Sequence, residues 1–365
     1  MKYLLAALLL SSCSSFRSPS SNTELETVSF RNKKLEKSFL RGTYAHLDEA
    51  TFETKFQLSL ERPLLFYRSY VNSFYSETQI KGHLNIAGTC LGDAHPENFG
   101  FISFNRTPYY VFNDIDDSGN CPIGLDIIRY FSALKLTGIS DRDFEKLAQL
   151  FEAYVVGEKQ EKFNFKLPDL IRANEKNLKK NTDGDKFLSR ENLEPLGKSE
   201  KQRIINALKG QIPGLEILDI ASYTKSDGGS GGLKRYWLIV KTASGHKELI
   251  EFKEQVSPAV AWTGVQQDSA RSATPQFIWG TFPDYYGYVY FDQTLFLTRT
   301  RADDFIDLGK LSSEDRFKIL SYQVFLMARF HQERLQSVGG IKAQWIIHNA
   351  QKVSQRYIDA FNAYR

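Results

Sequence analysis

The chain has 365 residues, of which 42% are hydrophobic and 25% are charged, as is typical of a globular protein with a sizeable core. Its net charge of +4 is small for this length, and the sequence has no dense cluster of Lys and Arg interleaved with aromatic residues. These features argue against nucleic-acid binding as the function.

The N-terminus is typical of a secretory signal. Residues 1–2 are Met and Lys, and the apolar run 3–10 that follows is too short to span a bilayer. The ending LSSC resembles the lipobox of bacterial lipoproteins, which implies a signal peptide over residues 1–12 and a lipid on Cys13. Ser14, in a place where Asp would imply inner-membrane retention, implies the outer membrane of a Gram-negative cell, facing the periplasm. An ordinary cleaved signal and a buried N-terminal helix are the alternatives.

After the signal, polar segments alternate with segments that have the pattern of amphipathic helices. The Ser-rich residues 13–24 predict a flexible tether. Apolar and aromatic residues at helical spacing predict helices at 50–60, 64–74, 123–136, 143–158 and 168–180. The very polar segment 181–201 predicts an exposed loop, with a short helix at 203–208 after it.

From residue 215 the pattern changes to strands. Residues 215–255 predict a β-meander, and the aromatic runs 277–279 and 288–298 add strand-like segments. Helices return at 313–336, where Ser312 or Ser313 can cap the first turn, and at 343–364. We therefore predict an α+β protein with a helical lobe at 25–214, a β-rich lobe at 215–300, and C-terminal helices at 301–365 that return to the helical lobe.

Two buried strands in the helical lobe end in polar loops. The runs 84–90 and 109–113 are followed by GDAHPEN and NDIDD. We expect the side chains of these loops to converge at one end of the strand pair, namely Asp93, His95, Asn98, Asp114 and Asp116. Carboxylates and an amide are oxygen ligands for a hard cation. The sequence thus predicts a metal site here.

Cys90 and Cys121 flank this stretch. In an exported protein they would lie in an oxidising compartment. A disulfide between them would staple the two loops and contribute about 3–4 kcal/mol in the loop-entropy model. The sequence leaves two buried free thiols as an equal alternative.

The spacing of these polar residues suits phosphoryl transfer. A kinase-type site needs an Asp that orients and deprotonates the acceptor hydroxyl, and an Asn and a second Asp that hold Mg²⁺ on the phosphates. Here the loop resembles the H-G-D-x-H-x-x-N loop of the aminoglycoside phosphotransferase branch of the kinase-like superfamily. That resemblance implies Asp93 as the catalytic Asp, and Asn98 and Asp114 as metal ligands with Asp116 as a further possibility. It also matches Asp126 to a second Asp that opens a helix. The sequence differs from this loop at its first position, where Leu91 takes the place of His.

His95 is grouped with Asp93 as a catalytic-loop residue, because a hydrogen bond from its ring would orient that loop. More closely, LGDAHPENFG, VFNDIDD and LDIIRYFSAL resemble the bacterial family called domain of unknown function 2252, with its GDxHxxNFG, NDFDE-like and D-x-x-R-L elements. Later pieces such as FKEQVSP and LMARFHQ fit as well, so that the resemblance covers most of residues 40–340. It implies a kinase-like fold.

A Gly-rich segment between two predicted strands fits this implication. Backbone amides of such a loop approach phosphates closely, and Lys253 lies on the next strand but one, where a kinase places its phosphate-binding Lys. The predicted loop residues are Gly228, Gly229, Ser230, Gly231 and Gly232. Taken alone, the segment favours a flexible β-turn; together with Lys253 and the GDAHPEN loop, a phosphate-binding loop becomes an equal alternative. Because it follows the catalytic loop instead of preceding it, we expect a circularly permuted kinase-like fold.

Three functions compete. The first is a phosphotransferase that uses ATP or another nucleotide with Mg²⁺ on an unidentified hydroxyl acceptor. The predicted export of the protein argues against this first function, because the periplasm holds no standing ATP pool. The second is a kinase-like lipoprotein that has lost catalysis and binds a ligand or partner. The third is a metal-dependent phosphoesterase, although the GNHE and GHxH elements of such enzymes are absent from the sequence.

Overall fold

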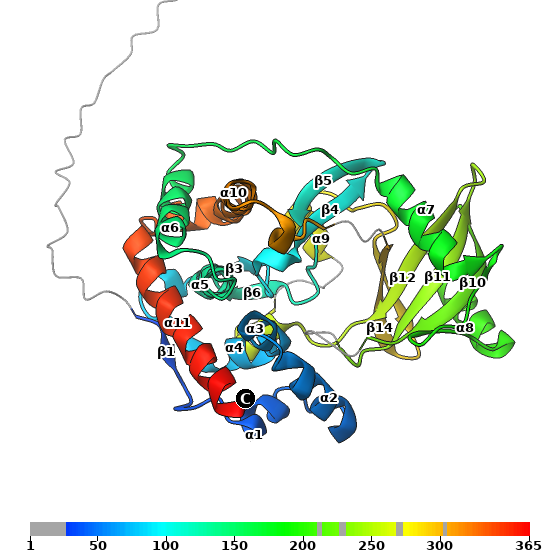
Figure 1. Ribbon diagram of the computed structural model, residues 1–365, viewed down its shortest axis with the longest axis horizontal. Helices are drawn as coiled ribbons and strands as arrows, with labels where there is room; N and C mark the ends of the chain where they lie inside the picture. Colours follow the sequence, from blue (N-terminus) through cyan, green and yellow to red (C-terminus); the bar gives the residue numbers. More distant parts are fainter. Residues whose placement is uncertain (1–26, 210–213, 226–230, 268–272, 302–304) are drawn as a thin grey trace, which may run out of the picture.

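The computed structural model describes residues 27–209, 214–225, 231–267, 273–301 and 305–365. These residues form a mixed α+β structure in two parts that lie side by side (Figure 1). We call the part built mainly from helices the helical lobe, and the part that contains a six-stranded antiparallel sheet the β lobe. The predicted signal, Cys13 and the tether lie outside the described residues.

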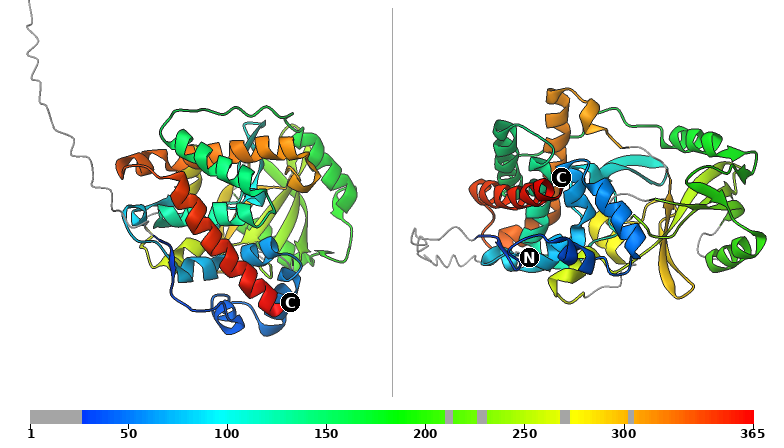
Figure 2. Two further views of the ribbon diagram at one scale, coloured as in Figure 1. Left: turned by 60° about the vertical axis from the view of Figure 1, so that its left-hand side comes forward. Right: turned by 60° about the horizontal axis from the view of Figure 1, so that its bottom comes forward.

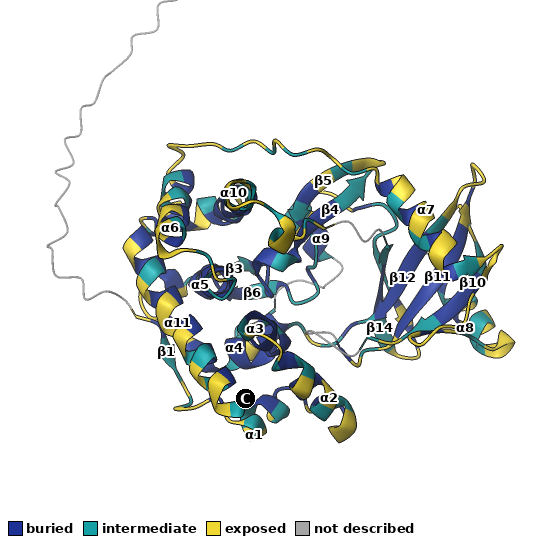
Figure 3. Cartoon of the chain, viewed as in Figure 1, coloured by how far each residue is buried: buried dark blue, intermediate teal, exposed yellow. Residues whose placement is uncertain are grey.

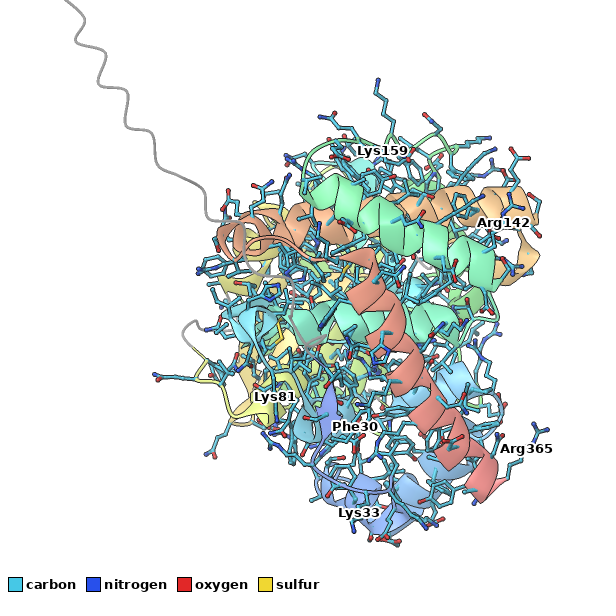
Figure 4. All side chains as sticks on the ribbon, turned by 90° about the vertical axis from the view of Figure 1, so that its left-hand side faces the viewer. Phe30, Lys33, Lys81, Arg142, Lys159 and Arg365 are labelled. Atoms are coloured by element: carbon cyan, nitrogen blue, oxygen red, sulfur yellow. A yellow bond between two sulfur atoms is a disulfide. The ribbon has the colours of Figure 1, made fainter. Side chains whose placement is uncertain are left out.

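The helical lobe surrounds one central helix, α5 (Ile123–Lys135), which is buried from its first residue to Leu134. Besides α5, the helices of this lobe include α1 (Lys37–Gly42), α2 (Glu49–Ser59), α3 (Pro63–Ser69), α4 (Val71–Glu77), α6 (Asp141–Val155), α10 (Ser313–Ser337) and α11 (Ala343–Tyr364). α11 runs across the lobe on the side away from the sheet (Figure 2). On that outer face the exposed Arg142 and Arg365 mark α6 and the end of α11 (Figure 4).

Helix starts in this lobe follow their capping residues. Ser140 accepts a hydrogen bond from the backbone N–H of Asp143 at the start of α6, and Ser312 does the same for Asp315 at the start of α10. Each cap satisfies an amide that has no partner inside the helix. Of the two serines predicted to cap the long C-terminal helix, Ser312 is therefore the one that does so.

The helical lobe also contains short strand pairs. They are β1 (Ser29–Phe30) with β2 (Thr78–Gln79), β3 (Ala87–Cys90) with β6 (Gly119–Pro122), and β4 (Phe99–Phe104) with β5 (Thr107–Phe112). The strands β3 to β6 border the two polar loops of this lobe. Cys90 and Cys121 form a disulfide with their Cα atoms 5.8 Å apart. The bond joins β3 to β6 directly before the first polar loop, and both cysteines are fully buried.

The β lobe is a sheet in the order β13-β14-β12-β11-β10-β9. Its strands are β9 (Leu193–Pro195), β10 (Leu215–Tyr223), β11 (Arg235–Thr242), β12 (Lys247–Glu254), β13 (Gly287–Phe291) and β14 (Thr294–Thr300). The central strands β11 and β12 are buried along most of their length (Figure 3). α8 (Lys198–Leu208) packs on one face, and α7 (Leu170–Asn181) covers one end of the other. The rest of that second face points toward the helical lobe.

Several elements differ from the sequence prediction. The predicted loop 181–201 contains β7 (Thr182–Asp183), β8 (Lys186–Phe187) and β9, because Phe187 and Leu193 pack under the sheet and draw this polar segment into pairing. The run 277–279 belongs to a helix, α9 (Thr274–Trp279), where Pro275 occupies the first turn. The predicted helix 64–74 is two helices that meet at Tyr70. β4 and β6 were not predicted.

The predicted single run 288–298 is a hairpin. Asp292 and Gln293 have φ values of 50° and 63°, so a tight turn separates β13 from β14. Such a turn favours positive φ, and Asp tolerates it better than most residues with a side chain. The aromatic residues on both sides hid the turn from the sequence pattern.

The packing also shifts the lobe boundary predicted at 214/215. α7, β9 and α8 pack with the sheet and belong to the β lobe. Conversely, Ala259 and Val260, which lie inside the predicted β lobe, belong to the core of the helical lobe. Trp279 also contacts the helical lobe, where its indole N–H donates a hydrogen bond to the carbonyl of Phe112. In the described part of the chain, none of the helices is long and apolar enough to cross a bilayer.

Candidate functional site

The first polar loop, 91–98, begins with a tight turn that only glycine allows. Gly92 has φ of +84°, and a Cβ atom there would lie 2.1 Å from the carbonyl oxygen of Asp117. The turn therefore brings this loop into contact with the second polar loop, which follows β5. The sequence predicted that the two loops converge at one end of a strand pair. In the structure the loops touch, but the two strands that precede them do not pair with each other, because β3 pairs with β6 and β5 pairs with β4.

Asp126 on α5 holds the first loop in place. Its carboxylate accepts hydrogen bonds from the backbone N–H groups of Leu91 and Gly92, both at 2.9 Å, and lies 2.8 Å from Nε2 of His331 on α10. Asp126 and His331 are both buried. The carboxylate thus lies behind the loop, where it fixes the backbone next to Asp93.

Asp93 is clamped by a buried arginine. Nη2 and Nε of Arg129 lie 2.6 Å and 3.2 Å from Oδ1 of Asp93, and Nε2 of His95 lies 3.4 Å from Oδ2. Burial raises the pKa of Asp93, but the neighbouring His95 and Arg129 lower it more, so that it falls well below its ordinary value. Asp93 is therefore ionised at neutral pH and suited to orient a hydroxyl group.

His95 lies behind Asp93 and is fully buried. Burial lowers the pKa of His95, and the charge of Arg68 lowers it further, since Nε of Arg68 donates a hydrogen bond to Nε2 of His95 at 3.1 Å. Arg68 also pairs with Glu97, which Arg62 contacts with both terminal nitrogens. His95 does not line the cavities between the lobes, and its part in orienting the loop stays a prediction.

The three predicted metal ligands lie around one cavity. Nδ2 of Asn98 donates a hydrogen bond to the carbonyl of Asp93 at 2.9 Å, which leaves the amide oxygen of Asn98 as the atom able to bind a cation. Oδ1 of Asp114 is buried and accepts no hydrogen bond. Asp116 forms an ion pair with Lys253. In the described part of the chain no group of three or more His, Cys, Asp or Glu is arranged as a metal site.

Two carboxylates and an amide nevertheless fit one kind of cation. Mg²⁺ is usually bound by one or two carboxylates, and takes its other ligands from water and from substrate phosphates. The buried oxygen of Asp114 without a hydrogen-bond partner is the observation that favours such a ligand.

Lys253 reaches the site from the β lobe. Its side chain is only 2% exposed and pairs with Asp116 across the two lobes. Of the predicted Gly-rich loop, Gly228, Gly229 and Ser230 lie outside the described residues. Gly232 has φ of +86° and packs so closely on α2 that a Cβ atom would lie 2.7 Å from Cγ2 of Thr51. Gly231 is buried beside it.

Two adjoining cavities lie between the lobes. The smaller, of about 60 Å³, is lined by residues of both lobes, among them Asp93, Asn98, Asp114, Asp116, Lys225, Leu233 and Lys253. Lys225 and Leu233, the residues on either side of the Gly-rich segment, thus lie beside the metal-ligand candidates. The larger cavity, of about 540 Å³, shares Asn98, Asp114 and Lys225 with the smaller one.

Sequence reasoning missed the arginines of the site. Arg129 stands in the segment LDIIRYFSAL that was compared with the D-x-x-R-L element, so the signal was present in the motif. Arg299 on β14 contacts Glu251 on β12, which also pairs with Arg235. Burial raises the pKa of Glu251, but Arg299 and Arg235 lower it well below its ordinary value. No local pattern indicates this cluster, because strand pairing assembles it.

Comparison with known proteins gives one match. Residues 47–157 match the model of a family described as an uncharacterized protein conserved in bacteria (DUF2252). This segment includes Asp93, Asn98, Asp114 and Asp126, whereas Lys253 and the Gly-rich segment lie outside it. The match is narrower than the resemblance over residues 40–340. No curated protein and no solved structure matches the chain.

Proposed function

We propose that this protein is a kinase-like phosphotransferase that transfers a phosphoryl group from a nucleotide such as ATP, with Mg²⁺, to a hydroxyl group. The observation that carries the proposal is the smaller cavity, which gathers Asp93, Asn98 and Asp114 from one lobe and Lys253 from the other. A phosphotransferase needs these residue types together, because positioning and charge stabilisation provide nearly all of its catalysis.

Each residue has a distinct part in this proposal. Asp93, held ionised by Arg129, orients the acceptor hydroxyl and accepts its proton. Asn98 and Asp114 would hold Mg²⁺, which supplies positive charge to the phosphates when bound. Lys253 binds phosphate oxygens from the β lobe. Asp116 is either a further metal ligand or the residue that keeps Lys253 in place in the absence of substrate.

The order of these parts along the chain supports a permuted kinase-like fold. The strand that carries Lys253, β12, follows the catalytic loop in sequence but lies across the cavity from it. The chain enters the β lobe at α7, contributes Ala259 and Val260 to the core of the helical lobe between β12 and β13, and leaves the β lobe for α10 after β14. Such rearrangements are tolerated where chain ends lie at the surface and core contacts are kept.

The sequence also supports a proposal on location. From the LSSC ending and Ser14 we propose that the protein lies on the periplasmic side of the outer membrane, anchored by a lipid on Cys13. The phosphate donor must then be one that reaches this compartment, and the acceptor is an unidentified molecule with a hydroxyl group.

Calorimetric titration tests the function. We expect ATP to bind with Mg²⁺ and much more weakly without it, and Asp114→Asn to weaken binding of the magnesium complex by about tenfold or more. Asp359→Asn, on the exposed side of α11, is the matched control and should bind like wild type. Asp93→Asn should retain binding and lose phosphoryl transfer.

Three outcomes would contradict the proposal. Wild type that binds no nucleotide would argue for a protein without catalysis. Unchanged binding by Asp114→Asn would remove the assigned metal site. Release of phosphate from a simple phosphoester, without nucleotide and abolished by a chelator, would favour a metal-dependent phosphoesterase instead.

A further inference from the structure

A buried cluster of charges forms part of the β-lobe face above the larger cavity. Glu251 on β12 is fully buried, and its carboxylate pairs with Nη1 of Arg235 at 3.0 Å and with Arg299 at 2.9 Å. A buried carboxylate is costly unless opposite charges compensate it. Two arginines here compensate one carboxylate, so the cluster as a whole keeps a positive charge.

Glu251 fixes the direction of Arg299. Both Nε and Nη2 of Arg299 lie 2.9 Å from Oε2 of Glu251, which uses one edge of the planar guanidinium. The remaining nitrogen, Nη1, lies 3.7 Å from Oδ1 of Asp114. This distance is too long for a hydrogen bond. The two side chains come from different lobes and both line the larger cavity.

Arg299 and Lys253 lie on the same face of the sheet. Glu251 pairs with Arg299 in the register of β12 and β14, and Lys253 pairs with Leu297. Lys253 and Arg299 are therefore diagonal neighbours, about 7–8 Å apart at the backbone. Opposite them stand Asp116 and Asp114, two residues apart on one loop. Two cations of the β lobe thus face two carboxylates of the helical lobe.

We propose that Arg299, aimed by Glu251, forms with Lys253 a two-point binding site for the linked phosphates of a diphosphate or longer polyphosphate group. This inference rests on the proposed function and extends it, since it assigns the phosphate site to a second residue. The guanidinium edge that Glu251 leaves open presents donors in the geometry that a phosphate accepts. Arg299 lines the larger cavity, which at about 540 Å³ has the size of a ligand pocket, and Lys253 lines the smaller cavity that adjoins it.

The arrangement makes metal and phosphate binding cooperative. Asp114 and Asp116 face Arg299 and Lys253, so the charge of each carboxylate is partly neutralised. Mg²⁺ alone must compete with these cations, and phosphate alone must compete with these carboxylates. When both bind, the cations turn to phosphate and the carboxylates to metal, so each ligand strengthens binding of the other.

Calorimetric titration with inorganic pyrophosphate and MgCl₂ tests the site on the whole chain without its signal. We expect wild type to bind pyrophosphate at least about tenfold more tightly with Mg²⁺ than without it. Arg299→Met should weaken binding of the magnesium complex by about tenfold or more, and Arg299→Lys by less, because it keeps the charge without the fork. Arg203→Met, an exposed arginine paired with Asp292 outside both cavities, is the control.

A double-mutant cycle tests the part of Glu251. If Glu251 acts through Arg299, then Glu251→Gln weakens pyrophosphate binding in wild type and has little further effect in Arg299→Met. Additive losses would show that Glu251 supports only the fold. Far-ultraviolet circular dichroism shows whether Arg299→Met has folded. If it has not, the pyrophosphate affinity of Arg299→Lys is compared with wild type instead.

The outcomes separate the two proposals. Wild-type affinity in a folded Arg299→Met, with binding still lost in Lys253→Met, would overturn the two-point site and leave the phosphotransferase proposal standing. Binding that is independent of Mg²⁺ in wild type would overturn the predicted cooperativity. Absence of any pyrophosphate and nucleotide binding by wild type would overturn both.

Discussion

At the scale of single residues, buried charges in this protein are compensated in pairs that hold the site. Asp93 lies against Arg129, Asp126 accepts two backbone amides and contacts His331, and Glu251 joins two arginines. Removal of one partner from such a buried pair leaves an uncompensated charge. These residues therefore couple the stability of the fold to the geometry of the polar loops.

His95 should make the stability of the protein depend on pH. Because its pKa in the folded protein lies below the ordinary value of 6.5, the unfolded chain takes up a proton more readily. The stabilisation is complete above this value and is lost as pH falls toward the folded pKa. Between pH 7.5 and 5.5, we expect wild type to lose up to about 1.4 kcal/mol per pH unit below 6.5, and His95→Gln to lose less.

Urea denaturation at the two pH values measures this difference. His246→Gln, which changes an exposed histidine at the turn between β11 and β12, should lose as much stability as wild type. An equal loss in His95→Gln and wild type would show that His95 does not contribute to the pH dependence.

At the scale of elements, glycine turns decide how the loops meet. Gly92 lets the first polar loop contact Asp117, and Gly232 lets the start of β11 approach α2. Both have positive φ, and both leave no room for a side chain. The Cys90–Cys121 disulfide joins β3 and β6 just before Gly92, so the backbone that leads to Asp93 is held on both sides.

Substitution of Gly232 should lower the free energy of unfolding by more than the backbone strain at positive φ accounts for. In Gly232→Ala the Cβ atom would lie 2.7 Å from Thr51 and 3.0 Å from Leu47, in addition to the positive φ. Gly184→Ala is the matched control, since Gly184 has φ of +60° and nothing lies within 4 Å of its Cβ position. We expect the control to lose about 1 kcal/mol of unfolding free energy, and Gly232→Ala about 1–3 kcal/mol more.

Chemical denaturation of both variants, analysed at constant slope, gives the two values. Equal losses would mean that α2 moves aside at no cost, and that the close contact between the lobes does not depend on a glycine here.

At the scale of the whole molecule, the cavities lie between two lobes that have separate hydrophobic cores. The helical lobe has one large core, while the sheet has a smaller core on each face. Across the seam the lobes are joined by the pair of Lys253 with Asp116 and by the approach of Arg299 to Asp114. A ligand that changes these contacts would therefore also change how the lobes are held together.

The location of the protein in the cell should depend on Cys13 and Ser14. In a Gram-negative host, we expect the full chain to fractionate with the outer membrane, Cys13→Ala to lose the lipid, and Ser14→Asp to remain in the inner membrane. Mass spectrometry of the mature N-terminus and membrane fractionation check these expectations. A Cys13→Ala variant that is still acylated and sedimented with membranes would contradict the lipid anchor.

The sequence by itself determined the α+β class, most helices, and the polar loops that carry Asp93, Asn98, Asp114 and Asp116. These features are local, because helical spacing and residues at strand ends show in consecutive positions. Only the tertiary structure decided that Lys253 meets Asp116, that Arg129 clamps Asp93, and that Glu251 aims Arg299. These contacts join residues far apart in the chain through strand register and lobe packing, which no short segment encodes.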